Sequence, residues 1–191
     1  MLTMSTRATE KFAVAPLVRL PLVLLYTCLV LPLPLLAPPE LGLLLLLGSL
    51  IGAILVLGML SEQVTISEKA IAVSYPFWFR WLALRQDWVL PWDQVTALVP
   101  VTTSQGGTVH YIRAKDLRGY LLPQRLERFD LFLTLVHQYS GISTDGVNRL
   151  TLPWTYLLVA VLSLLMLLGE VVAAVAIHRG WIASPVVSFL S

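Results

Sequence analysis

The sequence predicts an α-helical membrane protein with three transmembrane helices and one inserted, water-facing α+β domain. Of its 191 residues, 57% are hydrophobic and only 13% are charged, whereas about 25% of residues are charged in an ordinary soluble domain. Seventeen of the 24 charged residues lie in residues 61–150. The two flanking regions therefore contain almost no charge, and we assign them to the membrane.

The first flanking region predicts a transmembrane hairpin over residues 20–60. Residues 41–60 carry no charge, and a helix of that length crosses a hydrocarbon core of about 30 Å. Residues 20–37 are also apolar, but three prolines predict a kinked or partly unwound span: Pro21, Pro32 and Pro34. Basic residues before an apolar run are also typical of a signal peptide. A second span follows here at once, and the run lacks a small-residue cleavage site before Pro38.

A third span is expected over residues 151–178. Pro153 suits its first turn, because the missing proline N–H costs little at a helix start. The predicted organisation is an N-terminal tail, the hairpin, the inserted domain, the third span and a C-terminal tail, at residues 1–19, 20–60, 61–150, 151–178 and 179–191.

The distribution of basic residues predicts the orientation of the chain. Twelve of the 13 Lys and Arg residues lie in the N-terminal tail or the insert, and only Arg179 follows the third span. Basic segments stay on the cytoplasmic side of a membrane. We therefore expect the N-terminus and residues 61–150 on the cytoplasmic side of a bacterial inner membrane or a thylakoid membrane, in contact with membrane lipids.

Within the insert, short β-rich runs separated by turn residues predict an antiparallel meander. These runs are residues 64–66, 70–75, 94–101, 108–115 and 119–122. After Pro123 the apolar period becomes helical, and Gly141 is expected to end that helix. One face of the predicted helix is apolar, with Leu126, Phe129, Phe132, Leu133, Val136 and Tyr139. A helix that covers an open sheet gives a small α+β or barrel-like domain.

Residues 62–142 resemble the bacterial pleckstrin-homology-like domains that occur beside membrane helices. The resemblance lies in IAVSYPFWFR, LPWDQVTALVP, HYIRAKDLRGYLLP and a helix ending in QYSGI. The whole layout, with its QGG turn and GIST before the third span, resembles a conserved membrane family of cyanobacteria. More remotely it is similar to the photosystem I assembly-factor family, which has a two-helix anchor and a stroma-facing domain but no third span.

Residues 76–85 concentrate aromatic and basic side chains, which suit either a membrane interface or a protein hot spot. The candidates for docking to a partner or to the membrane interface are Phe77, Trp78, Phe79, Arg80, Trp81 and Arg85. The alternative is a strand hairpin whose aromatic side chains fill the core. For the nearby Trp88 and Trp92 we expect a core or strand-edge role.

Glu170 is the most specific polar feature, because it lies well inside the third span and an intramembrane acid indicates function by default. Ser163 and Ala173 share its helix face, which suits a close helix contact. Three interpretations stay open: a neutral carboxyl bonded to a neighbouring helix, a contact to a partner subunit, and proton or ion transport. Gly48 and Gly52 form a GxxxG motif that predicts packing of the second span.

No catalytic or cofactor motif is present in the sequence. The three histidines have no metal-ligand spacing, the single cysteine allows no disulfide, and no phosphate-binding or nucleophile motif occurs. The net charge of +2 gives no basic patch for nucleic acid. We expect a protein without cofactor, metal or catalytic residue that serves as an assembly or auxiliary factor of a larger membrane complex. The resemblance implies that this complex is photosynthetic. The alternatives are a lipid-sensing scaffold that uses Arg80 and Arg85, and a small transporter subunit that uses Glu170.

Overall fold

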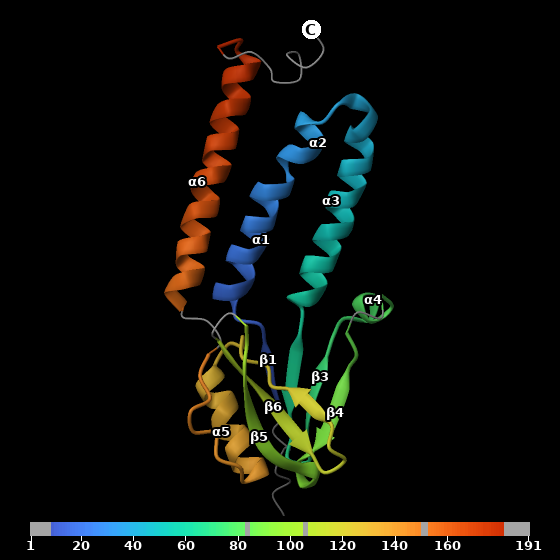
Figure 1. Cartoon of the computed structure of the whole chain (residues 1–191), viewed down its shortest axis with the longest axis vertical. Helices are drawn as coiled ribbons and strands as arrows, with labels where there is room; N and C mark the ends of the chain where they lie inside the picture. Colours follow the sequence, from blue (N-terminus) through green and yellow to red (C-terminus); the bar gives the residue numbers. More distant parts are fainter. Residues whose placement is uncertain (1–8, 83–84, 105–106, 150–152, 182–191) are drawn as a thin grey trace, which may run out of the picture. The chain divides into compact units, whose positions relative to one another are not determined.

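The computed structural model describes residues 9–82, 85–104, 107–149 and 153–181. It divides into two compact units, one made of residues 1–16 and 58–152 and the other of residues 17–57 and 153–191. The first unit is rich in β-strands, and we call it the β-domain. The second consists of apolar helices (Figure 1). The turn predicted at Gly106 and the tail beyond Trp181 lie outside the described residues.

The helical unit contains three helices that are long and apolar enough to cross a membrane. The first runs over Pro16–Leu36 as α1 (Pro16–Val30) and α2 (Pro32–Leu36), the second is α3 (Pro39–Met59), and the third is α6 (Pro153–His178). By length and composition, the three predicted spans are confirmed.

The predicted interruption of the first span is also present, at Leu31 between α1 and α2. Leu31 N–H still donates to Thr27 C=O at 2.9 Å. Pro32, however, has no N–H to continue the ladder to Cys28 C=O, and Pro34 repeats the defect two residues later. Figure 1 shows the two short helices in succession along one arm of the hairpin.

The β-domain contains two antiparallel sheets. The four-stranded sheet has the order β1-β2-β3-β4, and the three-stranded sheet has the order β5-β6-β7. Their bounds are β1 Glu10–Ala13, β2 Gln63–Ile66, β3 Ala70–Ser74, β4 Trp88–Pro91, β5 Val95–Thr102, β6 Thr108–Ala114 and β7 Gly119–Leu121. The short helix α4 (Phe77–Arg80) lies between β3 and β4, and one 3-10 turn, η1 (Trp92–Gln94), joins the sheets.

One hydrophobic core joins both sheets to the helix α5 (Phe129–Ser140). Alternate residues of the strands point inward, as the period of two requires; Val64 and Ile66 of β2 are fully buried. From α5, Phe129, Phe132 and Val136 enter the core. The predicted apolar face is confirmed for these residues, whereas Leu126 precedes α5 and pairs with Val14 in an isolated β-bridge. The helix ends at Gly141, which has a φ of 69°, as expected of a glycine after a helix.

The predicted domain boundary at residue 61 differs from the structure, because β1 belongs to the four-stranded sheet. Glu10–Ala13 pairs with β2 in antiparallel register, so the helical hairpin is inserted between two neighbouring strands. Phe12 of β1 is buried and packs against Phe132, with ring centroids 5.6 Å apart. Only one side chain of this four-residue strand is large and points inward, so no alternating pattern marks it in the sequence.

Candidate functional site

The segment around α4 is the best-defined candidate site, because packing holds one of its aromatic side chains and exposes the others. Phe79 is completely buried, and its ring occupies the space that a side chain on Gly58 would need. Its ring centroid lies 5.8 Å from that of Tyr75 and 5.9 Å from that of Trp78. Phe79 therefore lies in the core, as the alternative expected, but the segment forms the helix α4 and not a strand hairpin.

Asp87 holds the two ends of this segment together. Its carboxylate accepts a hydrogen bond from the backbone N–H of Tyr75 at 2.9 Å and one from Arg80 Nη1 at 2.7 Å. Tyr75 precedes α4 and Arg80 ends it, so one carboxylate closes the loop across twelve residues. A charge-assisted bond of this length is about twice as strong as a neutral one. The Arg80 side chain is consequently engaged within the domain.

Four apolar side chains of this segment remain at the surface. We call them the aromatic ledge: Phe77, Trp78, Trp81 and Leu82. Trp81 is 95% exposed and Phe77 is 76% exposed. Gathered apolar groups on a domain surface mark an interaction site more often than single ones do. Each of the two interpretations of this segment therefore applies to a part of it: Phe79 lies in the core, and the aromatic ledge is available for contact.

The neighbouring tryptophans have structural roles. Trp92 is buried, its Nε1–H donates to Ser67 C=O at 2.8 Å, and its ring stacks on Tyr139. Trp88, in β4, lies 4.9 Å from the ring of Tyr120. These contacts agree with the expected core or strand-edge role.

A group of four polar residues interacts electrostatically around Glu62. We call it the Glu62 cluster: Glu62, Tyr75, Arg85 and Arg125. Burial raises the pKa of Glu62, against the opposing effects of Arg85, a hydrogen bond from Tyr75, and Arg125. Burial, followed by the charge of Glu62, raises the pKa of Tyr75 to about 12. The tyrosine hydroxyl therefore stays protonated and donates to Glu62. The sequence alone gives no sign that residues 62 and 125 interact.

The two glycines of the GxxxG motif have different surroundings. A side chain on Gly52 would meet the hydroxyl of Tyr26 on α1, and the same hydroxyl donates to the backbone C=O of Ser49 at 2.5 Å. No atom lies within 4 Å of the position that a Cβ on Gly48 would occupy. Gly52 thus packs against the first span, whereas no atom of the described residues packs against Gly48.

Two polar atoms of α6 are buried without a hydrogen-bond partner in the described part of the chain, Ser163 Oγ and Glu170 Oε2. Ser163 has no exposed surface, and Glu170 is partly buried. Residues seven apart lie on the same helix face, so both belong to one inward strip of α6. Ala173, predicted on the packed face, is exposed.

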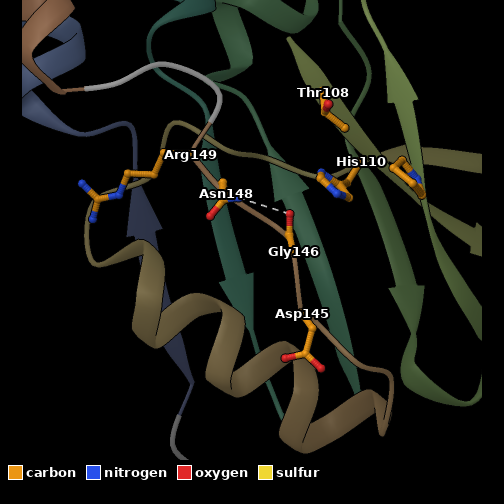
Figure 2. A pocket seen from close by; sticks show the side chains of 7 residues that line it. Thr108, His110, Asp145, Gly146, Asn148 and Arg149 are labelled. Carbon is orange, nitrogen blue, oxygen red and sulfur yellow. Dashed lines mark hydrogen bonds between the residues drawn. The ribbon is translucent and has the colours of Figure 1, made fainter.

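A pocket of about 360 Å³ lies between β5, β6 and the segment that precedes α6. Figure 2 shows the His110 ring facing Gly146 and Asn148, while Arg149 points away. Gln124 joins the walls, because its Nε2 donates to Asn148 C=O at 2.7 Å and lies 3.3 Å from His110 Nδ1. The pocket is lined by Pro100, Thr108, His110, Asp145, Gly146, Asn148 and Arg149.

His110 is 6% exposed, so it is a buried histidine of the β-domain. Burial lowers its pKa, so the ring is neutral near pH 7. Because Gln124 Nε2 is a donor, Nδ1 accepts and Nε2 carries the hydrogen. The sequence does contain a signal for this burial, which is the period of two in β6. His110 alternates in phase with Ile112 and Ala114, and both of these residues are buried. Among the described residues, no group of three or more His, Cys, Asp and Glu side chains could hold a metal ion.

The comparison with known proteins finds a relative of this chain, and that relative is described as uncharacterized. No family model matches the chain, and no solved structure matches it. The uncharacterized protein slr0269 of Synechocystis sp. (strain ATCC 27184 / PCC 6803 / Kazusa) is 40% identical over 164 residues, which cover 82% of this chain and 81% of that protein. Such similarity over most of both chains shows common descent, and the chain belongs to the cyanobacterial protein family that includes slr0269.

Proposed function

We propose that this protein is a non-enzymatic accessory or assembly factor of a larger membrane complex, and that it binds a subunit of that complex through the aromatic ledge. The observation that carries the proposal is the pair Phe77 and Trp81, which stay exposed while Phe79 anchors their helix in the core. Large aromatic side chains held in one conformation are typical of protein hot spots. The resemblance to the photosystem I assembly factors suggests a photosynthetic complex.

The rigidity of α4 favours a protein partner over lipid. Phe79 and the Asp87 bonds to Tyr75 and Arg80 hold the segment on both sides, so little conformational entropy is lost when a partner binds. The chain also has three candidate spans. Each span holds a protein in the membrane far more firmly than interfacial side chains do, so anchoring by the ledge would add little.

We also infer that the β-domain has a pleckstrin-homology-like fold on the cytoplasmic side of an inner or thylakoid membrane. Its four-stranded and three-stranded antiparallel sheets, followed by the C-terminal helix α5, support the fold. The excess of basic residues in the N-terminal region and the insert supports the orientation. Labelling of a cysteine placed at the exposed Leu117 by an impermeant maleimide, in inverted but not in right-side-out vesicles, would test it.

A photocrosslinking amino acid at position 81 tests the docking proposal in native membranes. We expect an adduct with one defined membrane protein, identified by mass spectrometry after denaturing purification. The same reagent at position 117 is the control, because Leu117 is 83% exposed on the turn between β6 and β7. That position should give no such adduct.

The variants Phe77→Ala and Trp81→Ala should reduce recovery of the partner in a mild-detergent pull-down, whereas Leu117→Ala should not. Both ledge residues are exposed, so these changes leave the core intact, and equal melting temperatures would verify this. Crosslinking of position 81 to lipid alone, or unchanged recovery of the partner with both ledge residues removed, would overturn the proposal.

A further inference from the structure

The pocket beside His110 belongs entirely to the β-domain. All the residues that line it lie in that unit, so its shape does not depend on the helical unit. Its volume of about 360 Å³ is at the lower end of the range for small-ligand pockets, which is about 300–1,000 Å³. The His110 ring forms one wall and faces Gly146 and Asn148 on the other (Figure 2). The pocket is therefore large enough for a small ligand in contact with this ring.

His110 brings an unused hydrogen-bond donor to the pocket. Gln124 Nε2 lies 3.3 Å from His110 Nδ1, so the hydrogen of the neutral ring is on Nε2. Among the described residues, none accepts a hydrogen bond from this Nε2. The residue is only 6% exposed, and a buried donor without a partner is unfavourable. A ligand that accepts this hydrogen would remove that cost.

The opposite wall also has donors to spare, whereas its carbonyl groups are engaged. Gly146 C=O accepts a hydrogen bond from Asn148 Nδ2 at 3.4 Å, and Asn148 C=O accepts one from Gln124 Nε2 at 2.7 Å. The backbone N–H groups of Gly146 and Asn148 donate to no described residue. Such surroundings suit a ligand with an acceptor, and a carbonyl oxygen can accept two hydrogen bonds at once.

The charges around the pocket favour an uncharged ligand. Asp145 and Arg149 are the charged residues among those that line it, and their charges cancel. Both side chains are directed away from the His110 ring (Figure 2). Arg149 Nη2 lies 3.7 Å from Asp130 Oδ2, and Asp145 Oδ2 accepts a hydrogen bond from Ser143 Oγ at 2.7 Å. No net charge remains to compensate the burial of an ionic group.

We propose that this pocket binds an uncharged amide, whose carbonyl oxygen accepts the hydrogen of His110 Nε2. The side-chain oxygens of Thr108 and Asn148 also lie among the lining residues, and they can accept the N–H of the same amide. A small amide molecule and a peptide segment share this chemistry. The inference does not depend on the aromatic ledge or on its partner.

Titration of the full-length protein in detergent with N-methylacetamide tests the proposal, followed by ¹⁵N NMR of the histidine side chains. We expect a saturable shift of the His110 Nε2 signal, which is identified by its absence in His110→Phe. Acetate, which has a similar size but carries a charge, should leave this signal in place. His137→Gln is the matched control, because His137 is exposed and its Nδ1 lies 2.8 Å from Ile142 C=O, outside the pocket. This variant should bind the amide like the wild type.

Two variants test the site by separate routes, with binding followed through the backbone amide signals of residues 146–149. His110→Phe should weaken binding by about three- to tenfold, which corresponds to the loss of one neutral hydrogen bond. Thr108→Trp should abolish binding, because the indole would fill the pocket. Thr108 is exposed, so this variant should keep the melting temperature of the wild type.

The source of the amide is distinguished by a longer probe, N-acetylalanine N-methylamide. Binding several times tighter than that of N-methylacetamide would assign the pocket to a peptide segment, whereas equal affinity would assign it to a small amide molecule. The absence of a saturable shift in the wild type would refute the proposal. Binding of acetate as tight as that of the amide, or undiminished binding in Thr108→Trp, would overturn it as well.

Discussion

The ring of Phe79 occupies the space that a side chain on Gly58 would need, so this ring packs directly against the backbone of Gly58. Gly58 precedes β2 by only a few residues, and Phe79 lies in the loop between β3 and β4. This contact holds Phe79, and with it the segment that carries the aromatic ledge, within the β-domain.

Gly58→Ala should destabilise the β-domain. The new methyl group would overlap the Phe79 ring, and overpacking of this kind costs about 1–3 kcal/mol. Thermal unfolding of the full chain, followed by tryptophan fluorescence, measures the change. The control is Gly48→Ala, where no atom lies within 4 Å of the new methyl group and alanine favours a helix by about 0.5–1 kcal/mol. A Gly58→Ala protein as stable as the wild type would contradict the contact.

Gly52→Ala should cost more in the wild type than in a Tyr26→Phe background. An alanine Cβ at residue 52 would lie 2.5 Å from the Tyr26 hydroxyl oxygen, which would have to leave its hydrogen bond with the C=O of Ser49. Phenylalanine has no hydroxyl there, so the clash disappears. A double-mutant cycle in detergent should give a coupling of about 1 kcal/mol. Additive effects would show that the two residues do not touch.

Glu62→Gln should raise the melting temperature at pH 7. Burial raises the pKa of Glu62 in the folded protein above the ordinary value of 4.5, so the folded chain binds the proton more tightly than the unfolded chain. The stabilisation from this group is then complete below pH 4.5 and is lost as the pH rises through the folded pKa. Glutamine stays neutral and still accepts the hydrogen bond from Tyr75.

The advantage of Glu62→Gln over the wild type should therefore shrink as the pH falls toward 4.5. Glu68→Gln, at an exposed turn, is the matched surface control and should show no comparable gain at pH 7. If Glu62→Gln melted below the wild type at pH 7, attraction to Arg85 and Arg125 would outweigh the cost of burying the carboxylate.

Acidification should loosen the segment before α6 through His110. Burial lowers the pKa of this histidine below its ordinary value of 6.5, so its contribution to stability is complete above pH 6.5 and declines as the pH falls toward the folded pKa. A protonated ring places a hydrogen on Nδ1, opposite Gln124 Nε2. As the pH is lowered from 7.5 to 5.5, hydrogen exchange of residues 146–149 in the wild type should become faster relative to the intrinsic rate at each pH. His110→Gln should remove this dependence, and His137→Gln should leave it unchanged.

Glu170→Leu should stabilise the isolated protein and weaken its complex. The substitution removes a buried carboxyl oxygen that has no partner in the described chain, and such a group costs about 1–3 kcal/mol. If a partner subunit supplies the missing bond, the pull-down of the complex should lose it, while Glu170→Gln retains part of the recovery. Loss of ion flux in Glu170→Gln with the complex intact would instead favour the transport interpretation.

Local sequence was sufficient to predict the three spans and α5. A span depends on the length of an uncharged run, because each helical residue contributes 1.5 Å, and α5 shows its buried face as a helical period that ends at Gly141. The missing donors of Pro32 and Pro34 also interrupt the first span by a local effect. These features need no information from distant parts of the chain.

Tertiary structure decided which side chains meet. β1 joins the sheet only by pairing with β2, some fifty residues later along the chain, and the four residues of β1 contain no pattern of their own. Phe79 is buried against Gly58, whereas Trp81, two residues later, is exposed. The loop before α5 is held to the N-terminal segment, because Ala15 N–H donates to Arg125 C=O. Such contacts depend on the packing of segments that are remote in sequence, and residue type alone does not specify them.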